Sequence, residues 1–244
     1  ELGIDSLSIF ELCVDIDNFF DVCIENSLGK DLTVSELAEI ISNQNEDTQN
    51  EEFDYNAFPL KRGKKDWNRF KAFDKWTRKN YDYSCSGLEN IDSNENYIFT
   101  PNHESHFDSM WMMNFLPREM QERICSMAAD YLFRKSIYKQ GVRIMGGIPV
   151  HRIGNTSTAM KRIYDLMTNG DASLMIHPEG TRTRDGKLGV FKTGAAELSI
   201  KTGIKIVPVG IIGAREIFPP NKMLPAMKKA VSYTHLTLPT NSRV

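Results

Sequence analysis

Short apolar segments alternate with segments of helical periodicity beyond residue 96, and this alternation constrains the fold more than any other feature. The segments typical of strands lie at 97–100, 147–150, 173–176 and 205–212. The segments typical of helices lie at 108–116, 156–169 and 194–201. Strand–helix alternation of this kind predicts an α/β domain with a largely parallel sheet flanked by helices.

Charge divides the chain into two parts. Residues 1–58 hold 15 acidic residues and one lysine, a net charge of −14. The remaining 17 acids and 29 bases give residues 59–244 a net charge of +12. Such asymmetry predicts two parts with different partners. Between them, residues 43–52 contain no apolar side chain, which is typical of a solvated linker. We therefore expect a small domain at 1–42, an acidic linker at 43–58 and a larger domain at 59–230.

The segment NHESHFD at 102–108 directly follows the first predicted strand. His103 stands five residues before Asp108, so the carboxylate can turn back to one ring nitrogen and leave the other as a base for a hydroxyl group. The alternative is a histidine that is merely satisfied inside the core. Zinc fits less well, because His103 and His106 are three residues apart, whereas helical zinc sites place histidines four apart. We expect no metal.

The segment HPEGTRTRDG at 177–186 combines turn residues with two arginines. Backbone N–H groups and guanidinium forks match phosphate oxygens, so the segment predicts an anion site. The alternative is an exposed basic turn. Arg152 ends GGIPVHR after another strand, where a lone arginine is otherwise typical of a surface ion pair. Pro208 interrupts the last apolar strand and predicts an edge position for that strand.

Together these segments resemble, in order and spacing, the motif set of the lysophosphatidate (1-acylglycerol-3-phosphate) acyltransferase family, over about residues 85–225. The resemblance implies an α/β fold and the transfer of a fatty acyl group from a thioester to a lipid hydroxyl. It also implies that His103 is the general base and that Asp108 is its partner. The residues that it implies at the acceptor head group are Glu179, Gly180, Thr181, Arg182 and Arg152.

The chain departs from the family pattern at two places. His177 stands where the family usually has phenylalanine before Pro-Glu-Gly. Residues 127–133 lack a lysine that many lysophosphatidate enzymes carry in this region. The missing lysine leaves a second acceptor open, a lysophospholipid other than lysophosphatidate.

Residues 1–42 resemble part of an acyl carrier protein. LGIDSL at 2–7 resembles the attachment motif, and TVSELAEII at 33–41 resembles a later helix that Thr33 and Glu36 would cap. The resemblance implies a partial all-α bundle in which Ser6 carries 4′-phosphopantetheine; the alternative is that Ser6 only caps a helix. Carriers of this kind are fused to acyl-activating synthetase domains, so we expect one upstream. The carrier segment then either feeds the transferase or serves as a docking module for that synthetase.

The basic and aromatic segment 61–83 predicts a helix with several aromatic residues on one face. Such a helix either packs into the core or lies on a membrane surface. We favour the membrane, because a lipid acceptor must be drawn from a bilayer. No apolar run in the sequence is long enough to span a bilayer as a helix, and the four cysteines show no paired spacing, which suits a reducing compartment. We expect a peripheral location at the cytoplasmic face of a membrane and no nucleic-acid partner.

The two ends of the chain carry further expectations. The segment VSYTHLTLPTNSRV at 231–244 does not continue the family pattern and resembles translated sequencing-adapter read-through. We therefore expect a non-native tail that takes no part in the fold. The chain opens at Glu1 without an initiator methionine, so we expect a fragment of a longer protein.

Overall fold

The computed structural model describes residues 33–39, 42, 62–129, 131–134, 136–150, 157–169, 171–222, 224–226 and 231–237. Ser6, the linker at 43–58 and Arg152 lie outside the described residues. Residues 34–39 are helical, and Thr33 caps them as predicted. The N–H of Glu36 donates to Thr33 Oγ1 at 3.3 Å, and the N–H of Thr33 donates to Glu36 Oε2 at 2.8 Å. The carrier bundle as a whole stays a prediction.

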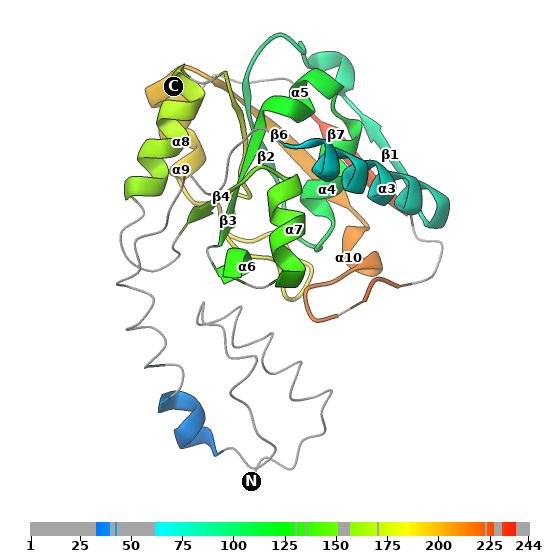
Figure 1. Cartoon of the computed structure of the whole chain (residues 1–244), viewed down its shortest axis with the longest axis vertical. Helices are drawn as coiled ribbons and strands as arrows, with labels where there is room; N and C mark the ends of the chain where they lie inside the picture. Colours follow the sequence, from blue (N-terminus) through cyan, green and yellow to red (C-terminus); the bar gives the residue numbers. More distant parts are fainter. Residues whose placement is uncertain are drawn as a thin grey trace.

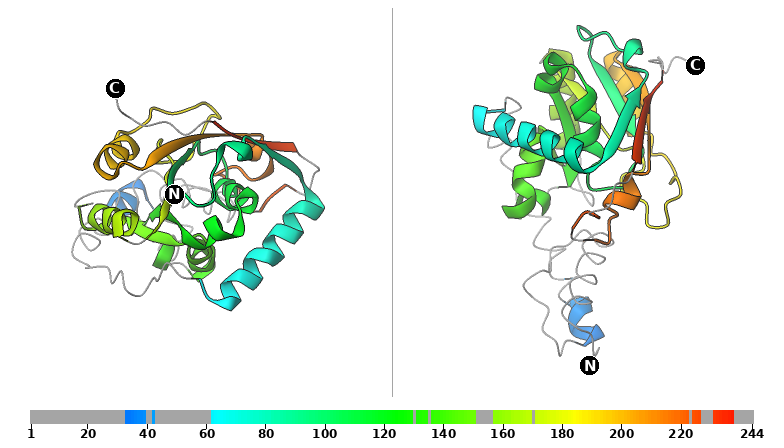
Figure 2. Two further views of the ribbon diagram at one scale, coloured as in Figure 1. Left: turned by 90° about the horizontal axis from the view of Figure 1, so that it is seen from above. Right: turned by 90° about the vertical axis from the view of Figure 1, so that its right-hand side faces the viewer.

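The larger domain is an α/β fold whose helices cover both faces of one sheet (Figures 1 and 2). Its strands are β1 (Asp82–Ser86), β2 (Tyr97–Pro101), β3 (Ile124–Ala129), β4 (Gly147–Val150), β5 (Ser173–Met175), β6 (Lys205–Ile212) and β7 (Val231–Leu236). Its helices are α3 (Lys64–Asn80), the 3-10 helix η2 (Leu88–Asn90), α4 (Asp108–Phe115), α5 (Arg118–Arg123), α6 (Tyr131–Arg134), α7 (Ser136–Ile144), α8 (Ser157–Asn169), α9 (Gly194–Thr202) and α10 (Ala214–Ile217).

The strand order is β1-β7-β6-β2-β5-β3-β4. Strand β2 pairs in parallel with both β5 and β6, and β3 pairs in parallel with β4 and β5, which confirms the largely parallel sheet. Each predicted strand and helix of 97–212 corresponds to an element of the structure. Because β2 is central, the loop that follows it opens in the middle of the carboxyl edge of the sheet, where α/β proteins place their sites.

Two apolar layers hold the sheet between its helices. Along β2, Phe99 belongs to the cluster that also contains Trp111 of α4, whereas Ile98 belongs to the cluster that contains Ile163 of α8 and Leu198 of α9. All five side chains are at most 3% exposed. Neighbouring residues of a strand point to opposite faces, so the continuous apolar sequence of β2 supplies both layers.

Helix α3 corrects the membrane interpretation of 61–83. Trp67 and Phe70 are buried against the core, and Phe73 packs edge-on against Phe107 at a ring-centroid distance of 5.2 Å. The aromatic face of the helix therefore faces the protein and supports the loop that contains Phe107. The sequence leaves core packing open as the alternative to a membrane-surface helix, because the spacing of the aromatic residues is the same in both cases. Among the described residues, no helix is both long and apolar enough to cross a membrane.

Strand β6 corrects the edge prediction from Pro208, because β6 lies between β2 and β7. Its antiparallel pairing with β7 begins one residue later, with Val209 opposite Leu236. The carbonyl of Pro208 still accepts from the N–H of Thr237 at 3.1 Å, but the proline has no N–H to return that bond, and the ladder on that side ends here.

The segment at 231–244 also differs from expectation. Residues 231–236 form β7, which pairs in parallel with β1 and antiparallel with β6. Thr234 and Leu236 are buried. VSYTHL contains valine, tyrosine and threonine, residues that are common in strands, and it forms a strand between β1 and β6. These residues therefore take part in the fold, and only their non-native origin stays a prediction.

Candidate active site

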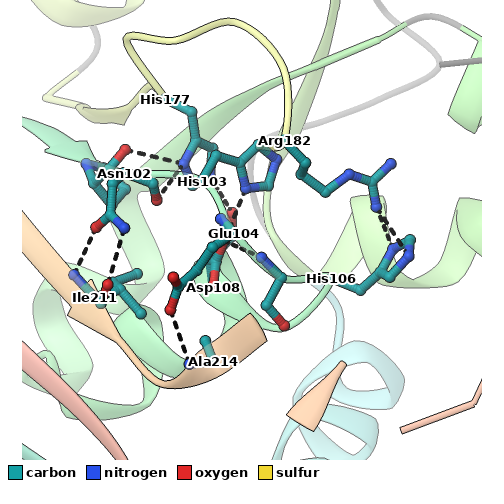
Figure 3. Close-up of polar contacts among 12 residues, drawn as sticks. Asn102, His103, Glu104, His106, Asp108, His177, Arg182, Ile211 and Ala214 are labelled. Atoms are coloured by element: carbon teal, nitrogen blue, oxygen red, sulfur yellow. Dashed lines mark hydrogen bonds and ion pairs between the residues drawn. The ribbon is translucent and has the colours of Figure 1, made fainter. Parts of the chain in front are cut away.

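His103 and Asp108 form a hydrogen-bonded pair where β2 leads into α4 (Figure 3). The distance between His103 Nδ1 and Asp108 Oδ2 is 2.9 Å. The aspartate side chain is fully buried, while that of His103 is 22% exposed. Because Nδ1–H donates to the carboxylate, Nε2 carries the lone pair that can take a proton. The predicted turn of the carboxylate back onto the ring is therefore present.

Two backbone groups share the same oxygen of Asp108. The N–H groups of Glu104 and Ser105 donate to Oδ2 at 2.7 and 2.8 Å. Burial nevertheless raises the pKa of Asp108 to about 6, although these N–H groups and the nearby His177 oppose the shift. Its other oxygen, Oδ1, is buried without a hydrogen-bond partner among the described residues. A buried carboxylate with a raised pKa and an oxygen that lacks a partner is typical of a functional site.

His177, the departure from the family pattern, stacks on His103. The ring centroids lie 3.7 Å apart and the planes are inclined by 13°. Its Nδ1–H donates to the carbonyls of Pro101 and Asn102 at 3.1 and 3.2 Å, and its Nε2 accepts from Ser109 Oγ at 2.8 Å. Burial, assisted by the nearby His103, lowers the pKa of His177 to about 3. A neutral ring therefore occupies the phenylalanine position without adding charge.

The loop at 102–107, called here the histidine loop, is hydrogen-bonded through its side chains to residues at and just beyond the end of β6. Asn102 makes two hydrogen bonds to Ile211, since its Nδ2 donates to the carbonyl at 2.9 Å and its Oδ1 accepts from the N–H at 2.6 Å. Glu104 Oε1 accepts from the N–H of Ala214 at 2.9 Å. The loop is thus fixed from residues more than 100 positions away, and sequence analysis missed both anchors.

Glu179 joins the histidine loop to the predicted anion turn. Its Oε1 accepts from the N–H of His103 at 2.8 Å, and its Oε2 accepts from the N–H of Gly189 at 2.7 Å. The N–H of Thr183 also donates to the carbonyl of His103 at 2.8 Å. The resemblance implied that Glu179 contacts the acceptor, but both of its oxygens are engaged by backbone, and a carboxylate repels phosphate. The geometry favours a role for Glu179 in positioning the backbone of His103 and Gly189.

Arg182 contacts His106 through Nη1 and the ring nitrogen Nδ1 (Figure 3). His106 Nε2 lies 3.3 Å from the carbonyl of Pro220, to which it can donate. Burial and the arginine charge lower the pKa of His106 to about 3. The neutral ring accepts a hydrogen bond from the guanidinium and so orients it. His106 was weighed only as a zinc ligand in the sequence, because its partner lies 76 residues away.

Gly180 and Thr181 are exposed at the tip of the turn. Gly180 has a φ of +72°, and a Cβ atom there would lie 2.7 Å from Nζ of Lys192. Glycine is therefore favoured by the backbone conformation, whereas the flexible end of the lysine side chain can move to make room for a Cβ atom. Lys192 brings an ammonium group beside the turn, although residues 127–133 lack the expected lysine.

The fold and the paired side chains define an α/β domain with a histidine–aspartate site beside a basic turn. The family model described as Acyltransferase matches residues 82–212, which contain both parts of that site. The chain belongs to this acyltransferase family.

Individual relatives agree with the family assignment. The chloroplastic 1-acyl-sn-glycerol-3-phosphate acyltransferase of Arabidopsis thaliana is 31% identical over 142 residues, which is 57% of this chain and 38% of the relative. The beta form of that enzyme from Homo sapiens is 34% identical over 116 residues, 46% of this chain and 40% of the relative. This chain thus matches less than half the length of either relative.

A solved structure supports the fold. The crystal structure of the 1-acyl-sn-glycerophosphate acyltransferase PlsC from Thermotoga maritima superposes with a TM-score of 0.57 at 22% identity, covering 72% of this chain and 70% of that one. At this identity the likeness concerns the fold alone.

Proposed function

We propose that the chain is an O-acyltransferase that moves a fatty acyl group from an acyl thioester to the hydroxyl of a lysophospholipid such as 1-acylglycerol-3-phosphate, in phospholipid synthesis. The observation that carries the proposal is the 2.9 Å bond between His103 Nδ1 and buried Asp108, on a loop hydrogen-bonded to the turn of Arg182. The names of the relatives support the acceptor class.

The proposed reaction needs a base and an activated acyl group. His103 Nε2 removes the proton of the acceptor hydroxyl while its oxygen attacks the thioester carbonyl carbon. Asp108 stabilises the imidazolium that forms. The tetrahedral intermediate collapses as the C–S bond breaks, and the leaving sulfur takes the proton from His103. The products are an ester and a free thiol, so protons and electrons balance.

The proposed acceptor head group is a phosphate or phosphodiester held at the turn. Arg182 offers a guanidinium fork and Gly180 and Thr181 offer exposed backbone, while Arg152 belongs to the same proposal by resemblance. The second candidate acceptor is a lysophospholipid other than lysophosphatidate, favoured by the missing lysine of residues 127–133.

The acyl donor in this proposal is bound to acyl carrier protein or coenzyme A. We propose that the carrier segment, with 4′-phosphopantetheine on Ser6, supplies it directly from an upstream synthetase. The charges of −14 and +12 favour docking between the two parts, and tethering supplies an effective concentration of the order of mM. In the alternative, the segment is only a docking module for the synthetase. The cytoplasmic face of a membrane remains the proposed location.

A direct assay tests the function. The purified full-length protein is supplied with a palmitoyl thioester and a soluble short-chain lysophosphatidate, and both released thiol and diacyl product are measured. We expect one thiol for each ester, and no product from His103→Ala. Thiol release without ester would instead indicate a thioester hydrolase.

A second experiment tests the carrier. Mass spectrometry of the protein from its host is expected to find acylated phosphopantetheine on Ser6. Transfer from the loaded protein should be first order in protein and resist dilution, whereas Ser6→Ala should still use an added thioester. A rate that falls in proportion on dilution would favour the docking-module alternative.

A further inference from the structure

The loop that follows the Arg182 turn carries three large apolar side chains in water. Leu188, Val190 and Phe191 are 65%, 90% and 55% exposed. Single exposed apolar residues are common, but a cluster of them on one loop is typical of an interaction site. In the right-hand view of Figure 2, this yellow loop projects beside α10.

Hydrogen bonds on its inner side hold this loop in place. The N–H of Gly189 donates to the buried Glu179, and that of Lys192 donates to the carbonyl of Pro178 at 2.8 Å. At its beginning, Arg215 of α10 donates to the carbonyl of Thr183 at 2.7 Å. These bonds hold the loop from within, and Gly189, which stands between Leu188 and Val190, is held by the carboxylate that also holds His103.

The charge of the loop indicates the chemistry of its partner. Residues 180–192 contain four basic residues and one acid, Asp185, and so carry a net charge of +3. The carboxylate of Asp185 accepts from the N–H of Lys187 at 3.0 Å, within the loop. Bases that flank large apolar side chains are typical of segments at the interface of anionic bilayers. The acidic carrier segment would match the charges but gives no reason for the apolar side chains.

We propose that residues 187–191 insert into the interface of an anionic lipid bilayer and hold the loop of His103 against the membrane surface. The proposal rests on the proposed transfer to a lipid hydroxyl. It assigns the membrane contact to this loop, because the aromatic face of α3 packs against the core. An acceptor would then pass from the bilayer to the Arg182 turn without crossing bulk water.

Vesicle binding tests this assignment. The full-length protein and its V190S/F191S variant are sedimented with vesicles of phosphatidylglycerol and phosphatidylcholine. We expect the partition coefficient of the variant to fall at least about tenfold, since two apolar side chains no longer leave water. The control is Ile200→Ser, which replaces a 68% exposed apolar residue in the last turn of α9 and should bind as the parent does.

A gain-of-signal variant keeps the test independent of folding defects. In V190W, the added tryptophan should shift its emission to shorter wavelength with anionic vesicles, whereas I200W should not respond. Equal sedimentation of parent and V190S/F191S, or no vesicle binding by the parent, would overturn the proposal. A second result would also overturn it: V190S/F191S binds vesicles as the parent does but transfers acyl groups more slowly when an acylated carrier protein is the donor. The loop would then be a docking site for the carrier.

The soluble assay separates this proposal from the proposed function. V190S/F191S should retain parental turnover with a monomeric short-chain lysophosphatidate and lose it with long-chain acceptor in vesicles. If the parent transfers no acyl group yet binds vesicles through this loop, the membrane contact stands and the acyltransferase proposal fails.

Discussion

The imidazole ring of His177 lies on that of His103, with 3.7 Å between the ring centroids. Because burial keeps His177 neutral, the contact places an aromatic face rather than a charge beside the predicted base. A phenylalanine at this position would offer an aromatic face too.

This stacking predicts different outcomes for two substitutions. His177→Phe should keep turnover within about threefold, because the ring face remains, although the lost hydrogen bonds should cost about 1–3 kcal/mol of stability. His177→Ala should lower kcat more strongly and leave the acceptor KM unchanged. Steady-state kinetics and thermal unfolding measure both effects. A folded but inactive His177→Phe protein would assign the polar atoms of His177 a direct part in the reaction.

Asp108→Asn should lower kcat by about 10³–10⁴-fold with folding intact. The amide cannot stabilise the imidazolium, and it can donate to Nδ1, which leaves the wrong tautomer of His103. The KM values for donor and acceptor should change little. Single-turnover rates of the purified variant check the expectation, and near-parental rates would remove the base assignment.

The same aspartate predicts a pH dependence of stability. Its pKa is about 6 in the folded protein against 3.8 ordinarily, so the folded state binds the proton more tightly. The free energy of unfolding should therefore fall by up to about 3 kcal/mol as pH rises from about 4 to 6. Asp108→Asn should lack this dependence and be at least as stable as the parent at pH 7. Urea unfolding of both proteins between pH 4 and pH 7 measures it; parallel curves would contradict it.

Arg182→Ala should raise the KM of the acceptor by at least about tenfold and leave that of the donor unchanged, because a guanidinium–phosphate contact is lost. The contact with His106 extends this prediction. His106→Leu should raise the acceptor KM in the same way, whereas His106→Asn should rescue it, because the amide oxygen replaces Nδ1 as the acceptor of the Arg182 bond. A donor-side defect in Arg182→Ala would assign the arginine to the thioester instead.

Lys192→Ala should raise the acceptor KM several-fold, on the order of 1 kcal/mol of binding, because its ammonium group lies beside Gly180 of the turn. The control is Lys201→Ala, in the last turn of α9. Both are assayed with a soluble short-chain acceptor, so that vesicle binding plays no part. Equal KM values for the two variants would show that Lys192 does not contribute to the acceptor site.

The sequence by itself determined the parts of this protein that depend on neighbouring residues. The periodicity of 97–212 predicted β2, β4, β5, β6, α4, α8 and α9, because each period follows from the local backbone geometry. The elements α5, β3, α6 and α7 between these were not predicted. The spacing of His103 and Asp108 predicted their hydrogen bond, because five residues of loop are enough for the carboxylate to turn back. The capping of residues 34–39 by Thr33 is equally local.

Only the tertiary structure decided which surfaces and side chains meet across long separations. The aromatic face of α3 was evident in the sequence, but periodicity cannot tell a protein core from a lipid interface, since both bury apolar area. Glu179, His106 and His177 each have one hydrogen-bond partner that lies about 70 residues or more away along the chain. Such contacts are set by the strand order, which brings the ends of β2, β5 and β6 together at one edge of the sheet.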